Sequence, residues 1–279
     1  MAKKRPEIAN SIRTGGYNTN YHDVGKGKGG DCPLVMLHGS GPGASAYGVW
    51  GRSFPLLGKT RRIVAPDVVG FGYTDRPEGI KYGMDVWVEQ VINLLDALKI
   101  KQADLIGNSF GGALVLAMAV RYPKRVHRIV LMCSMGTNFP ITYGLDRVWG
   151  YEPSVENMRE LLGIFSYDHG FINDDVARAR YEASIQPGFQ ESFRSMFPAP
   201  RQDSVAAIAG DEAYLNTVKQ PALILHGRED RVVPLQSALD LARVLENPEL
   251  HVFGKCGHWV QAERTEDFCL LAERFLSKK

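Results

Sequence analysis

The chain has 279 residues, which is enough for one large α/β domain that carries an insertion. Its net charge of +2 comes from 33 basic and 31 acidic side chains that are mixed along the sequence, without the basic block typical of nucleic-acid-binding proteins. No apolar stretch approaches the roughly 20 residues of a membrane span.

Two further features bear on the cellular compartment. The basic start of the chain runs into Pro6-Glu7 without the apolar core of a signal peptide. The four cysteines show neither C-x-x-C pairs nor the spacing of zinc ligands. We therefore expect reduced thiols in a cytoplasmic protein.

The first half of the chain alternates strands with helices. Residues 1–16 are expected to form a loosely held arm, and a strand at 17–24 and a glycine-rich turn at 25–30 follow it. Together with the next apolar run, this strand predicts an antiparallel start to the sheet. Periodicity and apolar runs then predict strands at 34–37, 63–65, 103–106 and 129–132, and helices at 85–98 and 113–120.

This alternation stops between about residue 136 and residue 211, where helix-like pieces carry many aromatic side chains. It resumes with a strand at 222–225, a helix at 235–245, a strand at 250–253 and a helix at 266–276. Strands that alternate with helices indicate a mostly parallel sheet covered on both faces. We expect a core domain from residues 1–136 and 212–279 and a helical lid at 137–211, with a ligand cavity between them.

The most informative stretch is Gly107-Asn-Ser-Phe-Gly111, which lies between a predicted buried strand and a predicted helix. Gly-x-Ser-x-Gly in this context is typical of a nucleophile elbow, in which the serine has a strained backbone at the tip of the turn. Neighbours without a Cβ let the strand and the helix pass closely, so that the Ser109 hydroxyl is held above the sheet. A glycine-rich turn with an incidental serine is the alternative.

A serine nucleophile needs a base, and the base needs an orienting acid. In this architecture they follow in the order serine, acid, histidine, each after a strand. Asp230 directly follows the strand at 222–225, and His258 follows the strand at 250–253. The sequence therefore predicts a Ser109, Asp230 and His258 triad. As alternatives, Asp230 could cap the next helix and Glu229 could be the acid.

Other titratable residues at strand ends are expected to be structural. His38 and His226 precede the loops that must reach Ser109, so hydrogen bonds to local backbone are the better interpretation for both. Asp67 comes before the serine in the chain and is expected to stabilise a turn.

An acyl-transfer site also needs donors for an oxyanion. The amide of Phe110, at the start of the helix that follows Ser109, is the first candidate. A second donor is expected from the loop after an early strand, which here is the glycine-rich segment 38–43. We assign it to the amide of Ser40; an ordinary glycine turn is the alternative.

With these motifs, the whole chain resembles an α/β-hydrolase of the meta-cleavage-product hydrolase family, the C–C bond hydrolases of bacterial aromatic degradation. The general motifs are His38–Gly43, Pro66–Gly72, Gly107–Gly112, His226–Asp230 and Gly257–Trp259. The narrower likeness is to the branch that handles products from phenol, toluene and alkylbenzenes, and it rests on Asn108 and the lid stretch Arg180–Gln202. The resemblance implies a mostly parallel eight-stranded sheet with helices on both faces and an inserted helical lid.

The resemblance implies the same triad and oxyanion hole, and it adds Asn108, Arg180 and Trp259 as contacts to the dienoate part of the substrate. Family members usually carry an asparagine two residues after the aromatic at Tyr47, where this chain has Val49. One polar substrate contact is therefore in question. The implied substrate is a 2-hydroxy-6-oxo-hexa-2,4-dienoate, such as 2-hydroxymuconic semialdehyde or a 6-alkyl analogue.

The implied reaction is hydrolysis of the C5–C6 bond to 2-hydroxypenta-2,4-dienoate and a carboxylic acid. Ketonisation lets the departing carbon leave as a stabilised dienolate, and His258 serves in proton transfers and as base toward Ser109. Arg180 would stabilise negative charge on the dienoate end. This chemistry needs no metal and no organic cofactor.

Two other functions stay open at this point. A carboxylesterase acting on small esters would use the same triad, and a non-catalytic hydrolase-fold binding protein would keep the fold alone. We expect a small-molecule substrate and neither a nucleic-acid nor a membrane partner. From the family we expect a homo-oligomer, a dimer or higher. The acyl-side substituent, whether formyl, alkyl or phenyl, is left undecided.

Overall fold

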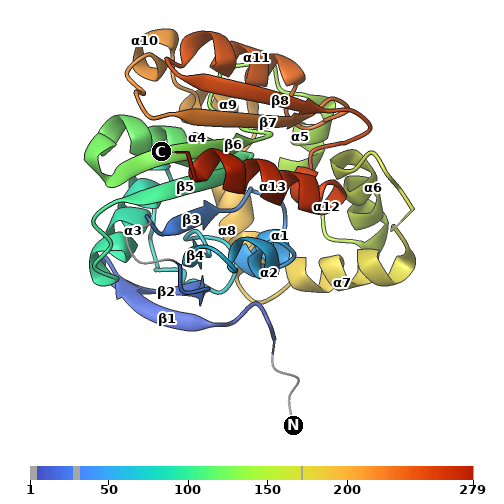
Figure 1. Ribbon diagram of the computed structural model, residues 1–279. Helices are drawn as coiled ribbons and strands as arrows, with labels where there is room; N and C mark the ends of the chain where they lie inside the picture. Colours follow the sequence, from blue (N-terminus) through green and yellow to red (C-terminus); the bar gives the residue numbers. More distant parts are fainter. Residues whose placement is uncertain (1–4, 28–31, 171, 279) are drawn as a thin grey trace.

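A computed structural model describes residues 5–27, 32–170 and 172–278 (Figure 1). Its strands are β1 (Asn10–Thr14), β2 (Tyr17–Val24), β3 (Leu34–Leu37), β4 (Ile63–Pro66), β5 (Ala103–Asn108), β6 (Val126–Met132), β7 (Ala222–Gly227) and β8 (Pro248–Phe253). Its α-helices are α1 (Ala46–Trp50), α2 (Phe54–Leu57), α3 (Met84–Ala97), α4 (Phe110–Arg121), α5 (Tyr143–Trp149), α6 (Val155–Phe165), α7 (Asp174–Ser184), α8 (Phe189–Met196), α9 (Gln202–Ile208), α10 (Glu212–Leu215), α11 (Leu235–Val244), α12 (Val260–Glu263) and α13 (Thr265–Leu276). The later residues of the turn expected at 25–30 lie outside the described residues.

The strands form one eight-stranded sheet in the order β1-β2-β4-β3-β5-β6-β7-β8 (Figure 1). β2 is antiparallel to both of its neighbours, and all pairs from β4 to β8 are parallel. Every residue of β3, β4, β5 and β7 is buried, as expected for parallel strands with both faces covered. The predicted fold class, a mostly parallel sheet between helices, is confirmed.

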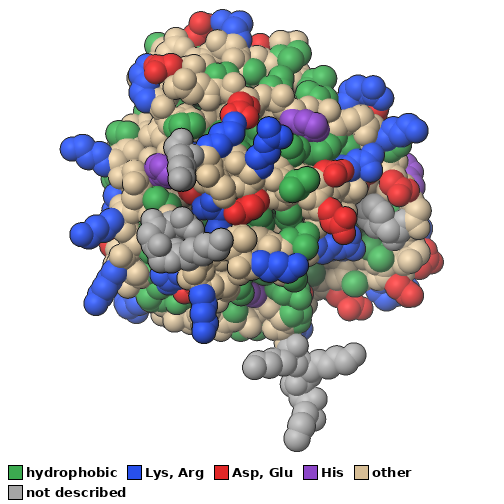
Figure 2. Space-filling view, viewed as in Figure 1, with side chains coloured by type: hydrophobic (Ala, Val, Ile, Leu, Met, Phe, Trp, Pro, Cys, Tyr) green, Lys and Arg blue, Asp and Glu red, His purple; other side chains and the backbone are tan. Residues whose placement is uncertain are grey.

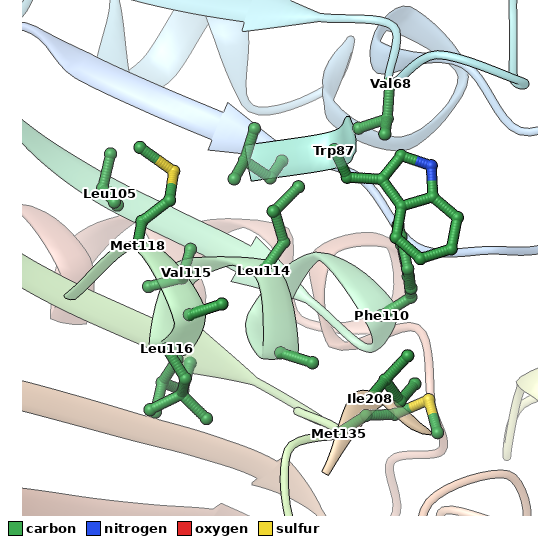
Figure 3. Close-up of a cluster of buried hydrophobic side chains, with 14 of the residues drawn as sticks. Val68, Trp87, Leu105, Phe110, Leu114, Val115, Leu116, Met118, Met135 and Ile208 are labelled. Carbon is green, nitrogen blue, oxygen red and sulfur yellow. The ribbon is translucent and has the colours of Figure 1, made fainter. Parts of the chain in front are cut away.

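Alternate residues of each inner strand face different hydrophobic cores. Leu34 and Met36 of β3 pack in a core with residues of α1, α2 and α13. Val35 and Leu37 face the opposite core, which α3, α4 and α11 cover. Figure 3 shows this second core around α4, where Phe110 at the helix start lies beside Trp87 of α3. The start of α4 is thus anchored by burial on the sheet.

The expectation of a loose arm at residues 1–16 is wrong for the described part of that segment. Residues 10–14 form β1, which pairs along its length with β2. Asn20 of β2 also ties down the preceding backbone, because it donates to Glu7 O (2.9 Å) and accepts from Ala9 N (3.0 Å). Most side chains of β1 are exposed, so the strand lacks the alternation of apolar residues by which a half-buried strand is recognised.

The sheet has an antiparallel start, but β2 and β3 are not partners in it. β2 pairs with β1 and β4, while β3 lies between β4 and β5 and is parallel to both. An entirely buried strand is best placed in the interior of a sheet, where strands on both sides satisfy its backbone groups. Its position is therefore set by burial, and the hairpin suggested by sequence proximity does not form.

The chain between β6 and β7 folds into helices α5 to α10, and no strand occurs there among the described residues. α6 and α7 pack on each other at the side of the sheet (Figure 1), and their residues Met158 and Arg180 share a cavity with Ser109 at the end of β5. Phe171, one of the aromatic residues in this segment, lies outside the described residues.

The surface and the helix lengths bear on possible partners. On the face shown in Figure 2, basic and acidic side chains are both present, and neither forms a continuous band across the molecule. None of the helices in the described ranges is long and apolar enough to cross a membrane.

Candidate active site

Ser109 occupies the turn between β5 and α4 in a strained backbone conformation. Its φ is 56° and its ψ is −119°, a region that non-glycine residues rarely adopt. The turn is held on both sides, because Ser109 N donates to Met132 O (2.9 Å) and Met135 N donates to Ser109 O (3.0 Å). The predicted elbow geometry is therefore present, and the neighbouring strand β6 maintains it.

The glycines of the motif are required by close backbone contacts. A Cβ on Gly107 would lie 2.3 Å from Gly111 O, and a Cβ on Gly111 would lie 2.3 Å from Leu37 O. A Cβ on Gly112 would lie 2.0 Å from the Ser134 hydroxyl oxygen. Each distance is well below van der Waals contact, so larger residues would separate α4 from the strands and displace Ser109.

The loop after β3 lies against the elbow. A Cβ on Gly39 would be 3.2 Å from Ser109 Cβ, which places the backbone of this loop beside the serine. The Ser40 hydroxyl accepts a hydrogen bond from Trp149 Nε1 of α5 (3.0 Å), and Ser40 lines the same cavity as Ser109. Phe110 is the first residue of α4, where a backbone amide has no acceptor within the helix. Both candidate oxyanion donors thus come from segments next to Ser109.

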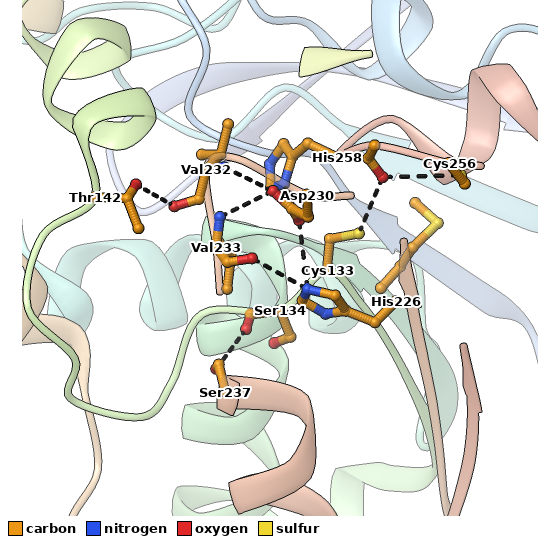
Figure 4. A network of polar contacts seen from close by, with 12 residues as sticks. Cys133, Ser134, Thr142, His226, Asp230, Val232, Val233, Ser237, Cys256 and His258 are labelled. Atoms are coloured by element: carbon orange, nitrogen blue, oxygen red, sulfur yellow. Dashed lines mark hydrogen bonds and ion pairs between the residues drawn. The ribbon is translucent and has the colours of Figure 1, made fainter. Parts of the chain in front are cut away.

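Asp230 and His258 meet above the ends of β7 and β8. His258 Nδ1 donates to Asp230 Oδ2 at 2.7 Å, and Asp230 Oδ1 accepts from Val232 N (2.7 Å) and Val233 N (3.0 Å), as Figure 4 shows. His258 N donates to Phe165 O at the end of α6 (2.7 Å). His258 and Ser109 line one cavity, so the structure brings the residues of the predicted triad to a single site.

The electrostatics favour an ionised Asp230. Burial by itself raises the pKa of this carboxyl, but the interactions with His258, and with His226 behind it, outweigh burial and hold the pKa below its ordinary value. A carboxylate in this position keeps the proton of His258 on Nδ1, and it stabilises the imidazolium that forms when His258 takes a proton.

His226 has a second contact that the sequence did not reveal. Its Nε2 lies 3.1 Å from Val233 O, in line with the expected backbone hydrogen bond, and also 3.5 Å from Asp230 Oδ2 (Figure 4). Burial lowers the pKa of His226, so the neutral ring faces the carboxylate. In the sequence, this contact is indicated only by the position of His226 and Asp230, which lie four residues apart at the end of a predicted strand.

The other two acidic residues at strand ends, Glu229 and Asp67, bind groups other than His258. Glu229 accepts from Cys256 N (3.0 Å) and pairs with Arg228, so the competing acid does not face His258. Asp67 accepts from Ala46 N (2.6 Å) and Tyr73 N (2.7 Å), which is the structural role expected for it. Burial raises the pKa of Asp67 to about 6.

His38 is also structural, and its contacts define its protonation. Its Nδ1 donates to Gly39 O (2.8 Å), while its Nε2 accepts from Val68 N (3.0 Å). Burial lowers the pKa of His38 from 6.5 to about 4. The neutral ring therefore connects the loop that carries Ser40 to the backbone after β4.

The expected substrate contacts line the same cavity. Asn108 donates to Met132 O (3.2 Å) through its Nδ2, and Trp259 stacks on Phe165 with ring centres 4.6 Å apart. Arg180 Cζ lies 5.2 Å from the centre of the Trp259 ring, and Arg180 Nη2 donates to Gly48 O (3.3 Å). Asn108, Arg180 and Trp259 are thus gathered beside Ser109.

Arg180 has no acidic partner within 4.0 Å among the residues that the structure describes. Asp174 and Glu182, two acids on the same helix, do not neutralise it: Asp174 binds Arg159, and Glu182 forms no ion pair with Arg180. Burial lowers the pKa of Arg180, and the positive charge of Arg52 adds to this effect. A partly buried guanidinium without a counter-ion is costly, so this position favours the binding of an anion.

The cavity around Ser109 is narrow. Its volume is about 40 Å³, room for only a few water molecules. Besides the residues already described, Val49 and four side chains of α5 and α6 that the sequence did not single out line it: Leu145, Val148, Met158 and Phe165. Periodicity cannot distinguish a residue that faces a cavity from one that faces the core.

One group of side chains has the composition of a metal site. Ligand atoms of Cys133, His226 and Asp230 lie within 4.8 Å of one another, the one such group in the described ranges. The Asp230 oxygens, however, already accept from His258 and from the backbone at Val232 and Val233. The arrangement is accounted for by the orientation of His258.

Comparison with known proteins agrees with this geometry. The alpha/beta hydrolase fold family matches residues 33–265. The chain is 50% identical over 277 residues to the 2-hydroxy-6-oxo-2,4-heptadienoate hydrolase of Pseudomonas putida strain F1, with 99% of each chain covered. It is 52% identical over 273 residues to the 2-hydroxymuconate semialdehyde hydrolase of Pseudomonas sp. strain CF600, covering 98% of this chain and 95% of that one.

A solved structure is similar throughout. The meta-cleavage product hydrolase CumD from Pseudomonas fluorescens IP01, crystallised as a serine-to-alanine variant with acetates, is 53% identical, with a TM-score of 0.95 over 97% of this chain and 98% of that chain. The chain therefore belongs to the alpha/beta hydrolase fold family and, within it, to the meta-cleavage product hydrolases, as its motifs indicate.

The neutral state of His38 predicts a pH-dependent contribution to stability. Its pKa is lower in the folded than in the unfolded chain, so its contribution is complete above pH 6.5 and declines as pH falls toward 4. Between pH 7 and pH 5 the unfolding free energy of the wild type should fall relative to His38→Gln by about 2 kcal/mol. Urea unfolding of both proteins measures this, and the opposing effect of Asp67 is common to both. A difference independent of pH would contradict the assignment.

Proposed function

We propose that this chain hydrolyses the C5–C6 bond of 2-hydroxy-6-oxo-hexa-2,4-dienoates, yielding 2-hydroxypenta-2,4-dienoate and a carboxylic acid. The observation that carries the proposal is the composition of one cavity. Ser109, His258 backed by Asp230, and Arg180, which pairs with no acid in the part of the chain that the structure describes, come together there. A serine beside a histidine and an aspartate is suited to acyl transfer, and the arginine is suited to a substrate that carries a carboxylate. The names of the relatives from Pseudomonas support the same reaction.

The proposed roles follow from these positions. After ketonisation of the dienol, Ser109 Oγ attacks the C6 carbonyl carbon and His258 takes its proton. The alkoxide is held by the amides of Ser40 and Phe110. The C5–C6 bond then breaks, and its electron pair passes along the C3–C4 double bond to the C2 oxygen. The resulting dienolate is protonated on that oxygen, which gives 2-hydroxypenta-2,4-dienoate. Water attacks the acyl-enzyme with His258 as base, releasing the acid and restoring Ser109.

Arg180, Asn108 and Trp259 are assigned to the dienoate half of the substrate. The guanidinium would pair with the C1 carboxylate and stabilise charge that spreads over the dienolate as the bond breaks. Stacking on the Trp259 ring limits the positions open to Arg180. Val49 stands where family members usually carry an asparagine, so one polar contact to the substrate is lost. Binding of the dienoate would therefore depend more on Arg180.

The helices between β6 and β7 are proposed to act as a lid over a core formed by residues 1–136 and 212–279. Two features support this: α5 binds the Ser40 loop through Trp149, and α6 and α7 supply Met158 and Arg180 to the cavity. The small inner cavity, with Leu145 and Val148 on its wall, favours formyl or short alkyl acyl groups over phenyl.

Location and assembly are also part of the proposal. We infer that the enzyme works in the cytoplasm as a homo-oligomer without a nucleic-acid or membrane partner. Cys133, Cys256 and Cys269 are buried thiols, and burial raises the pKa of Cys256 to about 12, in accord with a reducing compartment. Gel filtration with light scattering would determine the assembly.

The nucleophile is tested by Ser109→Ala. Because the acyl-enzyme can no longer form, kcat on 2-hydroxymuconic semialdehyde should fall by about 10³-fold or more, with residual rate from binding and the oxyanion donors. Circular dichroism and the melting temperature control for folding. A variant that keeps a tenth of wild-type turnover would exclude Ser109 as the nucleophile.

The acid is tested with a matched pair of neighbours. Asp230→Asn should reduce kcat by about 10³-fold or more, because an amide cannot hold the His258 tautomer as a carboxylate does. Glu229→Gln removes only the exposed pair with Arg228 and weakens one bond to Cys256 N, so a loss below about tenfold is expected. The opposite order of damage would show that Glu229 is the acid.

The reaction type is tested by Arg180→Gln, with Arg178→Gln on the same helix as control. Loss of a charge-assisted interaction of about 1.5–3 kcal/mol should lower kcat/KM on the dienoate at least about tenfold. Turnover of p-nitrophenyl acetate, which has no carboxylate, should change much less. Equal losses on both substrates would mean that Arg180 supports the lid, and no loss on either would favour the carboxylesterase.

A further inference from the structure

A second, larger cavity adjoins the one at Ser109. Its volume is about 530 Å³, against about 40 Å³ for the inner cavity. The two share the side chains of Val49, Arg180 and Trp259, which therefore form the wall between them. The inner cavity alone is too small for a whole dienoate, so a substrate bound at Ser109 must extend through this wall.

The outer cavity is enclosed by segments that are far apart in the sequence. Residues 43–52 around α1, residues 176–183 of α7 and the start of α12 form most of its walls. The N-terminal segment supplies Glu7, and Arg5 beside it bonds both the Tyr73 hydroxyl (3.1 Å) and Gln186 Oε1 (2.6 Å). This segment is thus tied both to the core and to the chain that follows α7.

The charges on the walls are unbalanced. Arg52 and Arg180 both line the outer cavity, and Glu7 is the one acidic side chain among its described lining residues. Among described residues, no carboxylate lies within 4.0 Å of either guanidinium. The charge of Arg52 acts on Arg180, since it helps to lower the pKa of that group. Unpaired cations in a concave, partly desolvated space attract anions from solution.

We propose that the outer cavity is the access chamber for the anionic substrate, and that Arg52 captures the substrate carboxylate before it passes to Arg180 at the inner wall. The inference rests on the proposed function and adds a residue to it. Arg52 is exposed and lines only the outer cavity, so it acts on arrival and binding and has no contact with the reacting bond. Glu7 opposes it on the same walls.

This arrangement predicts opposite effects from two single-charge changes. At low ionic strength, Arg52→Gln should lower kcat/KM on 2-hydroxymuconic semialdehyde by about threefold, and Glu7→Gln should raise it by about twofold, because charges at a rim act on association. Both changes should appear in KM with kcat unaltered, since neither charge touches the transition state. Arg178→Gln, on the exposed side of α7, is the matched control and should behave as the wild type.

The experiment measures kcat and KM of the wild type and the variants on this dienoate and on p-nitrophenyl acetate, in about 20 mM and about 500 mM NaCl. The ratio of the two substrates should fall for Arg52→Gln and rise for Glu7→Gln, and both effects should shrink at high salt. Equal changes on the ester and the dienoate, or variants indistinguishable from the wild type on the dienoate, would overturn the inference.

The same data separate this inference from the proposed function. A wild-type enzyme that hydrolyses the ester but not the dienoate would overturn the proposed function and the inference together. Normal turnover of the dienoate by the wild type, with salt-independent variants, would overturn only the role of Arg52. Replacing Ala179 on the chamber wall with tryptophan adds a steric test: if the chamber is the route, Ala179→Trp should lower kcat/KM on both substrates.

Discussion

The close crossing of β5 and α4 is the constraint on which the rest of the site depends. The strand and the helix approach until a Cβ on Gly107 or Gly111 would overlap backbone oxygens, and Ser109 at the turn between them is held at a φ of 56°. Such a conformation persists only where packing enforces it. Here the buried Phe110 and the hydrogen bonds to β6 do so, and the hydroxyl is left at the edge of the sheet.

The other functional side chains reach Ser109 because parallel strands end at the same edge of a sheet. β3, β7 and β8 end in the loops that carry Ser40, Asp230 and His258, so residues distant in sequence converge without long connections. The loops that carry Ser40 and Asp230 are each fixed by a buried histidine. His38 binds Val68 N, and His226 binds Val233 O behind Asp230. Neutral imidazoles are suited to this role because burial costs them little.

The helical segment between β6 and β7 contributes both shape and charge to the cavity. Trp149 of α5 and Phe165 of α6 bond the Ser40 hydroxyl and the His258 backbone amide, so these helices contact two residues of the candidate site. Arg180 brings a positive charge to the wall between the two cavities, and no described acidic residue pairs with it. A hydrophobic site with one unpaired cation discriminates by charge at one end of a ligand and by size at the other, which is what a dienoate with a small acyl group requires.

The sequence by itself determined the strand and helix alternation and the elbow at Ser109, because these depend on local spacing. From chain order the sequence predicted Asp230 as the acid, with Glu229 as an alternative. It missed β1, whose exposed side chains carry no apolar pattern, and it misplaced β3, because strand neighbours are decided by which edges can be buried. Only the tertiary structure showed that Arg180 has no acidic partner among the described residues, that His226 touches Asp230, and that two cavities share one wall. These are contacts between segments far apart in the chain, and no local pattern of residues encodes which of them come within a few ångströms of one another.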